Sequence, residues 1–137
     1  MLRAIAAAAL LSAAAAAQAC GFCIEDKIAS TYDHALVTLA LAQKHHIAFF
    51  HIDGPVLPGE GTKRWLESAA ASTAGVDKGS ARVALDTLTI SVAFDPRRSS
   101  LIAVQTALEK KLAARKLSLM PLRVIERPAE LKAVSRR

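Results

Sequence analysis

The chain has 137 residues, a length that suits a single domain. Its 53% apolar content and its two cysteines exclude a disordered chain and a cystine-rich miniprotein. The net charge of +6 is unevenly distributed, and only the first 19 residues, of which 16 are apolar, approach the length of a membrane-spanning helix.

Residues 1–19 have the features of an export signal. The segment begins with a positive charge, continues with an alanine-rich apolar stretch and ends in Ala17-Gln18-Ala19, the small-x-small pattern that signal peptidase recognises. We therefore expect cleavage after Ala19 and a periplasmic or secreted protein that begins at Cys20. Two alternatives stay open. One is a lipoprotein acylated at Cys20, although Ala17 stands where lipoproteins usually have leucine, and the other is an uncleaved anchor helix.

Hydrophobic periodicity predicts the elements that follow this segment. Apolar residues recur at helical spacing over 24–43, and β-branched and aromatic residues predict a strand over 46–52. Glycines and prolines make 54–62 a loop. The remaining predicted elements are a helix over 63–73 capped by Thr62, strands over 81–86 and 88–95, a helix over 101–112 capped by Ser99 or Ser100, and a strand over 117–125 whose Pro121 indicates an edge position or a bulge.

The order of these elements predicts an α+β fold: a ferredoxin-like βαββαβ sandwich preceded by an extra N-terminal helix. Two helices cover one face of its antiparallel sheet, and we expect the extra helix to cover the other face. The chain then divides into the signal peptide (1–19), a segment with the cysteines and the first helix (20–45), the ferredoxin-like domain (46–126) and a basic C-terminal tail (127–137).

Acidic and basic residues are also unevenly distributed along the chain. Residues 20–95 carry 6 basic and 9 acidic side chains, whereas residues 96–137 carry 11 basic and 3 acidic ones. Export and the lack of interleaved aromatic residues argue against nucleic-acid binding. A solvated basic surface is the simplest interpretation, and an acidic protein partner or an anionic membrane surface stays open for the basic C-terminal part.

The pair Cys20 and Cys23, in the sequence Cys-Gly-Phe-Cys, is the chemical motif of this chain. Two thiols at this spacing form a disulfide or hold one soft ion, and the start of a helix stabilises the thiolate form. Thiolates select Cu(I) and Zn(II) over harder ions. In the simplest alternative, a short disulfide only staples the terminus, and such a small loop adds little stability.

Among the four histidines, His51 is the one that geometry brings to the cysteines. A helix over 24–43 is about 30 Å long and the following strand about 25 Å, so a short linker makes them antiparallel. The start of the helix then returns to the end of the strand, and a metal site of Cys20, Cys23 and His51 follows. His34 lies about 16 Å along the helix from Cys23, too far to share an ion with it.

The stretches Gly75-Val76 and Val92-Ala93-Phe94-Asp95-Pro96, together with the order of elements over 46–125, resemble the heavy-metal-associated domain. This resemblance implies a ferredoxin-like fold and binding of a soft metal ion. The family holds its ion with a Met-x-Cys-x-x-Cys loop directly after the first strand. In this chain that place is the loop 54–62, which has no cysteine, and the Cys-x-x-Cys pair stands at the expected mature N-terminus instead.

These features favour a non-enzymatic, exported protein that binds copper(I) or zinc as a chaperone or sequestering factor. A periplasmic thiol-disulfide exchange protein using the same two cysteines is the alternative, although thioredoxin-like enzymes have a strand before their cysteine pair and this chain has none. A structural or interaction module with a stapling disulfide is the third interpretation.

Overall fold

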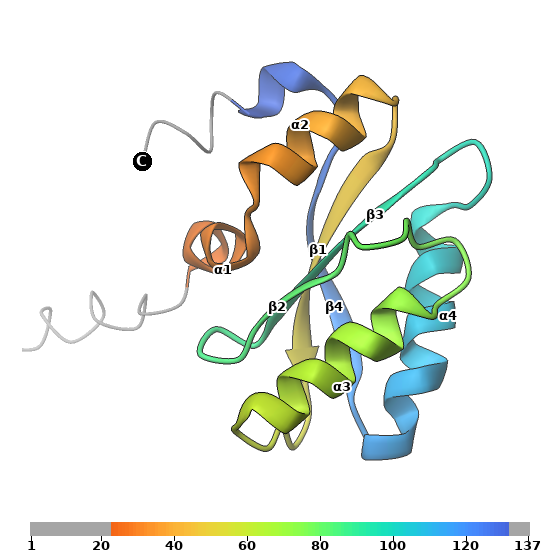
Figure 1. Cartoon of the computed structure of the whole chain (residues 1–137). Coiled ribbons are helices and arrows are strands. Elements are labelled where there is room, and N and C mark those ends of the chain that lie inside the picture. The colour runs from red at the N-terminus through yellow and green to blue at the C-terminus, as the bar shows by residue number, and fades with distance from the viewer. Residues whose placement is uncertain (1–22, 132–137) are drawn as a thin grey trace, which may run out of the picture.

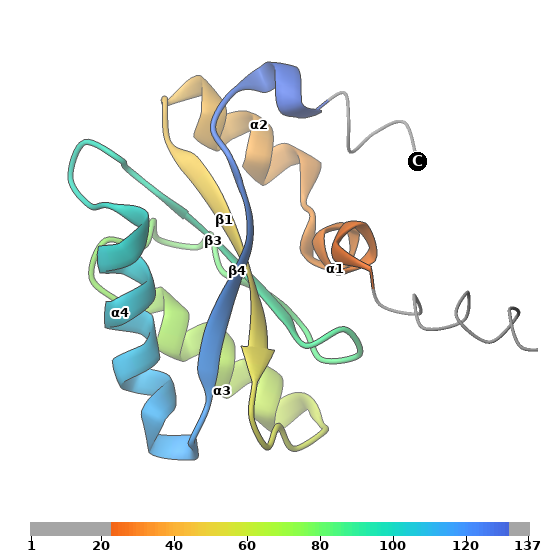
Figure 2. The same cartoon turned by 180° about the vertical axis from the view of Figure 1, so that it is seen from behind.

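The computed structural model describes residues 23–131, and its centre is one antiparallel sheet of four strands (Figure 1). The strands are β1 (His46–Asp53), β2 (Arg82–Ala84), β3 (Thr89–Phe94) and β4 (Ser118–Ile125), arranged in the order β2-β3-β1-β4. Helices α3 (Glu60–Ala71) and α4 (Leu101–Leu112) lie on one face of the sheet, and α1 (Ile24–Thr31) and α2 (His34–Ala42) lie on the other (Figures 1 and 2). The predicted α+β, ferredoxin-like βαββαβ arrangement with additional N-terminal helical cover is therefore confirmed.

Alternation along β1 divides the apolar side chains between two cores. Phe50 and Ile52 face α3 and α4, while Ile47 and Phe49 face α1 and α2. All four are fully buried. Because the residues of β1 are buried on both faces, this central strand reads as a nearly continuous apolar run, and the two helical layers are equally necessary to exclude water from it.

The predicted single helix over 24–43 is wrong, because the chain forms two helices with a break between them. Tyr32 has an extended backbone, with φ −70° and ψ 119°, and Asp33 begins a new helix as its N-cap. The Asp33 carboxylate accepts a hydrogen bond from the Leu36 backbone N–H at 3.1 Å and pairs with Arg82 at 3.1 Å. An N-cap aspartate competes effectively with helix continuation, and it turns α1 away from the axis of α2.

Several other element boundaries differ from the sequence prediction. Helix α3 begins at Glu60, three residues earlier than predicted, since its N-cap is Gly59 and not Thr62. Strand β2 shortens to three residues, and Leu88 belongs to the turn with φ +52°. The Ser100 cap of α4 is confirmed by a 3.1 Å hydrogen bond that its hydroxyl accepts from the Ala103 N–H.

Strand β4 has the edge position that its proline indicated. It pairs with β1 alone in the described sheet, and the register shifts between Phe49 and Phe50, where Pro121 lies opposite Phe50. A bulge at this point lets the strand accommodate a residue that has no backbone N–H. Within residues 23–131, no helix is long and apolar enough to span a bilayer.

Candidate functional site

The first turn of α1 carries the candidate thiol. Cys23 is the N-cap residue, its backbone is extended, and its side chain is exposed. The thiol donates to the Asp26 carboxylate, with Sγ 3.2 Å from Oδ2. Two carboxylates, those of Glu25 and Asp26, lie in this first turn. Cys20, the other predicted ligand, lies outside the described residues.

Helix α1 crosses the sheet, and contacts on both sides fix its position. Near its start, Glu25 pairs with Arg123 of β4, with a distance of 3.1 Å from Nη1 to Oε2. This carboxylate raises the pKa of the Arg123 guanidinium. Near its end, the Ser30 hydroxyl lies 2.6 Å from the Thr87 hydroxyl in the turn between β2 and β3. Between these contacts, Ile28 is fully buried against the sheet.

This crossing brings α1 over His51, the third predicted ligand. Lys27, one helical turn beyond Cys23, has its Nζ 3.2 Å from Nδ1 of His51 and donates to the Thr87 carbonyl at 2.7 Å. When an ammonium donates to Nδ1, the neutral imidazole carries its proton on Nε2. His51 therefore accepts a metal ion at Nε2 only if the ring proton moves to Nδ1 and Lys27 turns away.

The predicted trio of ligands is only partly described by the structure. Among residues 23–131, no three His, Cys, Asp or Glu side chains are grouped closely enough to hold a metal ion. The structure brings α1, whose N-cap is Cys23, over the strand that carries His51, but by the crossing of a separate short helix and not by the single antiparallel helix that was predicted. A site of Cys20, Cys23 and His51 stays a prediction, because one of its thiols lies outside the described part of the chain.

Met120 is a soft donor that the sequence analysis missed. It lies directly opposite His51 in the β1–β4 register, and its side chain is 54% exposed. Directly opposed residues of antiparallel strands share a face and have Cβ atoms about 5 Å apart. The His51 and Met120 side chains therefore stand next to each other on the α1 face of the sheet. No local pattern predicts this pairing, since the bulge at Pro121 decides which residue of β4 opposes His51.

The remaining described histidines have other partners. His45 lies between two carboxylates, with Nδ1 2.5 Å from Asp77 and Nε2 3.7 Å from Asp95. His46 packs edge-on against Phe94, and His34 lies 3.2 Å from the Tyr32 hydroxyl. Arg97 donates to Asp95 and, by this hydrogen bond, holds the pKa of the Asp95 carboxyl below its usual value.

This second cluster lines a cavity of about 550 Å³ between the α2–β1 turn and the start of α4. Because the two nitrogens of His45 point to different carboxylates, the cluster joins three segments of chain and does not converge on one ion. The cluster around His45 also lies far from the His51 end of β1, over which α1 passes, since His46 and His51 lie toward opposite ends of the strand.

The elements described above define a ferredoxin-like domain with a second helical layer. A scan against protein-family models and a search of curated protein sequences find no match. Solved structures that are similar include a copper-binding domain from HMA7, a P-type ATPase, at 20% identity and TM-score 0.46, covering 58% of this chain and 96% of that chain.

Two bacterial structures are similar to a comparable degree. One is oxidised MerP from Ralstonia metallidurans CH34, with 17% identity and TM-score 0.44 over 56% of this chain and 96% of that chain. The other is the N-terminal domain of a potential copper-translocating P-type ATPase from Bacillus subtilis in its Cu(I)-loaded state, with 21% identity and TM-score 0.43 over 56% and 86%. These likenesses are remote, and the resemblance to the heavy-metal-associated domain is one of fold, fixed by the strand order and helix placement.

Proposed function

We propose that this chain is an exported, non-enzymatic protein that binds a soft metal ion, Cu(I) or Zn(II), through the thiolates of Cys20 and Cys23, with His51 as a third ligand. In this role it carries or sequesters the ion. The observation that carries the proposal is the passage of α1 over His51, because Lys27, one turn beyond Cys23, contacts the His51 ring at 3.2 Å. Cys23, at the start of this helix, is therefore one helical turn from the residue that contacts the imidazole.

The chemistry of the donors supports a soft ion. Two thiolates and one imidazole match the preferences of Cu(I) and Zn(II), and hard ions such as Mg²⁺ prefer oxygen ligands. The heavy-metal-associated proteins that this chain resembles hold their ion in the loop after the first strand. The corresponding loop of this chain, 54–59, has no cysteine, so the metal-binding role is assigned to Cys20 and Cys23 instead.

Anaerobic titration of the reduced protein with Cu(I), against a competing chelator of known affinity, tests the proposal. Cys20→Ser and Cys23→Ser are each expected to weaken binding at least 100-fold, because each removes one of two thiolates, at a cost of about 3 kcal/mol for a strong ligand. His51→Ala is expected to weaken it less. His34→Ala is the matched control, since His34 is exposed and lies on α2. Unchanged affinity in both serine variants would refute the proposal.

Thiol-disulfide exchange is the second candidate, and the exposure of Cys23 at a helix N-terminus favours it. An exposed thiol is accessible to a disulfide, which its thiolate form attacks through a mixed-disulfide intermediate. Catalytic reduction of insulin disulfides by the reduced protein, lost in Cys23→Ser, would support this candidate. A pair that stays oxidised and inert toward both metal and thiol reagents would instead support the stapling disulfide.

A further inference from the structure

Among the described residues from 96 to 131, every basic side chain outside one segment forms an ion pair with a carboxylate. Arg97 and Arg98 pair with Asp95, Arg123 pairs with Glu25, and Arg127 pairs with Glu130. In contrast, four basic residues occur within seven positions at the end of α4 and the turn after it. They are Lys110, Lys111, Arg115 and Lys116, and none forms an ion pair with a residue in the described range.

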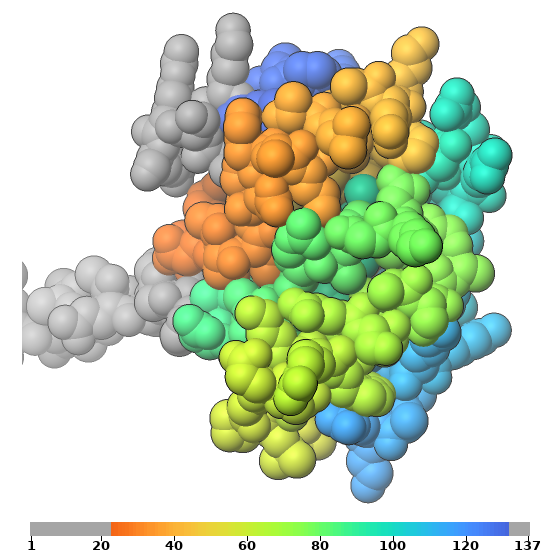
Figure 3. Space-filling view, in the orientation of Figure 1, coloured from red at the N-terminus to blue at the C-terminus, as the bar shows by residue number. Residues whose placement is uncertain are grey.

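Two contacts fix the turn after α4 in place. The Arg115 guanidinium lies over the Trp65 ring of α3 at 4.0 Å from its centroid. The Lys116 carbonyl approaches Gly54 so closely that a Cβ at position 54 would be 2.6 Å from it. Arg115 and Lys116 are therefore held close to α3 and to the loop that follows β1, and the turn after α4 and this loop share the lower end of the molecule (Figures 1 and 3).

That loop presents an apolar side chain to solvent. Leu57 is 69% exposed, the largest exposure among the apolar residues of this end. Pro55 and Pro58 lie on either side of Leu57 and restrict the loop backbone. Burial of Leu57 against another surface therefore costs little backbone conformational entropy. Asp53 and Glu60 lie at the two ends of the loop, on either side of the leucine.

We propose that this end of the molecule, defined here as the basic end and made of Leu57, Arg115 and Lys116 together with Lys110 on the last turn of α4, binds the surface of an anionic lipid bilayer. Leu57 enters the headgroup region while the three cations lie near the lipid phosphates. A protruding apolar side chain beside cations without ion-pair partners is the combination that interfacial membrane binding uses. A bilayer surface is fluid and uniformly negative, so binding to it does not require shape complementarity. A short loop tip therefore suits such a surface better than it suits a folded acidic protein.

Co-sedimentation of the protein with lipid vesicles tests this proposal. The protein is used with the N-terminus that it has when it is isolated from cells. The vesicles are phosphatidylcholine alone or phosphatidylcholine mixed with phosphatidylglycerol. Binding is expected only to the mixed vesicles and is expected to weaken as salt is added, since exposed charges are screened. Each lysine near an anionic surface contributes roughly a fivefold gain in partitioning. Lys110→Gln combined with Lys116→Gln should therefore weaken binding about 25-fold.

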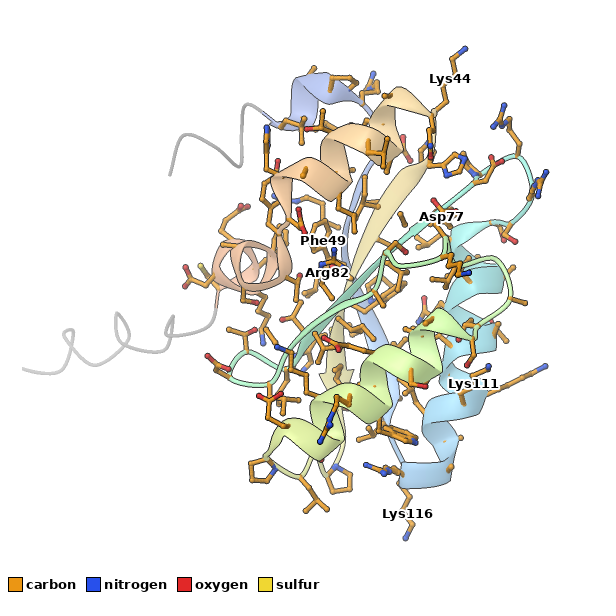
Figure 4. All side chains as sticks on the ribbon, in the orientation of Figure 1. Lys44, Phe49, Asp77, Arg82, Lys111 and Lys116 are labelled. Atoms are coloured by element: carbon orange, nitrogen blue, oxygen red, sulfur yellow. The ribbon has the colours of Figure 1, made fainter. Side chains whose placement is uncertain are left out.

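The chain offers a closely matched control at its other end. Lys44 and Lys116 both have a left-handed backbone, with φ of 61° and 60°, and they stand at opposite ends of the molecule (Figure 4). Lys44→Gln combined with Lys78→Gln removes the same charge and should leave binding unchanged. Leu57→Ser should weaken binding without changing its salt dependence, and Glu60→Gln should strengthen it.

Three outcomes would overturn the proposal. They are equal binding to neutral vesicles, equal losses in the two double-lysine variants, and binding to polyglutamate without binding to phosphatidylglycerol vesicles. The last outcome would assign the basic end to an acidic protein partner. Since Lys110, Lys116 and Leu57 are not proposed metal ligands, Cu(I) affinity in these variants should stay unchanged, which keeps this test separate from that of the metal site.

Discussion

Lys27 occupies the position at which the proposed metal site would receive a cation. Its ammonium group lies against the ring of His51 and is also held by the Thr87 carbonyl. A positive charge there repels an incoming ion, and the ammonium occupies the Nδ1 side of the His51 ring. The Lys27 ammonium group must therefore be displaced before His51 binds a metal ion. Lys27 and the metal ion compete for the same imidazole.

Replacing Lys27 should reveal this competition. Lys27→Met keeps the aliphatic stem and removes the ammonium, and we expect roughly a fivefold gain in Cu(I) affinity because the His51 ring is then no longer occupied by Lys27. The gain should vanish in the His51→Ala background, because no imidazole then remains to be released. Lys44→Met, at the opposite end of the sheet, is the control. An equal gain with and without His51 would mean that Lys27 acts only as a remote charge.

Met120 offers a test that separates copper from zinc at the proposed site, because it lies opposite His51. A thioether is a good ligand for Cu(I) and a poor one for Zn(II). Met120→Leu preserves the size and apolar character of an exposed residue, so the fold should be unaffected. We expect about a tenfold weakening of Cu(I) binding with Zn(II) binding unchanged, measured by chelator competition. Equal effects on both ions would exclude the sulfur as a ligand.

Thr31 has a buried hydroxyl without a hydrogen-bond partner, alone in this respect among the buried side chains that the structure describes. Thr31→Val removes the unsatisfied group at constant shape and should raise the free energy of unfolding by about 1 kcal/mol. Thr73→Val is the matched control, because the buried Thr73 hydroxyl donates to the Ala69 carbonyl at 2.7 Å and its loss should destabilise the protein. Urea unfolding measures both, and stabilisation in neither variant would contradict the account of Thr31.

At the scale of elements, the break between α1 and α2 decides where the thiol lies. A continuous helix over 24–43 would run along β1, whereas the Asp33 cap lets α1 turn and cross the sheet from β4 toward the β2–β3 turn. The Leu36 backbone N–H and the Arg82 guanidinium both stabilise the Asp33 carboxylate, and they hold the pKa of Asp33 below its usual value. One side chain thus caps α2 and ties it to the edge strand β2.

The two roles of Asp33 can be separated by substitution and pH. Asp33→Asn keeps an N-cap but loses the charge, and Asp33→Ala loses both, so the urea midpoint at pH 7 should fall in that order. Because the pKa of Asp33 is depressed in the folded state, the contribution of the charge is complete above the unfolded value of about 3.9 and is lost as the pH falls through the folded value. The wild type and Asp33→Asn should converge in acid. A constant difference at all pH values would contradict this.

At the scale of the whole molecule, local sequence signals predicted the fold. The surroundings of the candidate site depend instead on tertiary contacts that these signals do not reveal. The alternation in β1, the Ser100 cap and Pro121 each act within a few residues, and they fixed the strand order of a ferredoxin-like sheet. The break at Asp33 was missed, because Tyr32 continues the apolar spacing of a helix. Lys27 and Met120 could not be assigned, since their neighbours depend on how α1 crosses the sheet and on a bulge in β4.

The two cores on either side of the sheet give the last prediction. Ile28 lies in the core beneath α1 and α2, and Leu108 lies in the core beneath α3 and α4; both are fully buried. Replacing either by alanine should cost about 2–5 kcal/mol of unfolding free energy, because each leaves a cavity of similar size.

Only Ile28 also seats α1 over His51, so only its loss should loosen the helix that carries Cys23. In Ile28→Ala, under conditions where the protein stays folded, the Lys27–His51 contact should be lost and amide exchange in α1 should accelerate, whereas Leu108→Ala should leave both unchanged. NMR of the His51 ring and of α1 amides measures this difference. Equal acceleration in both variants would mean that the two layers open together, and that the sheet does not insulate the candidate metal site from the opposite core.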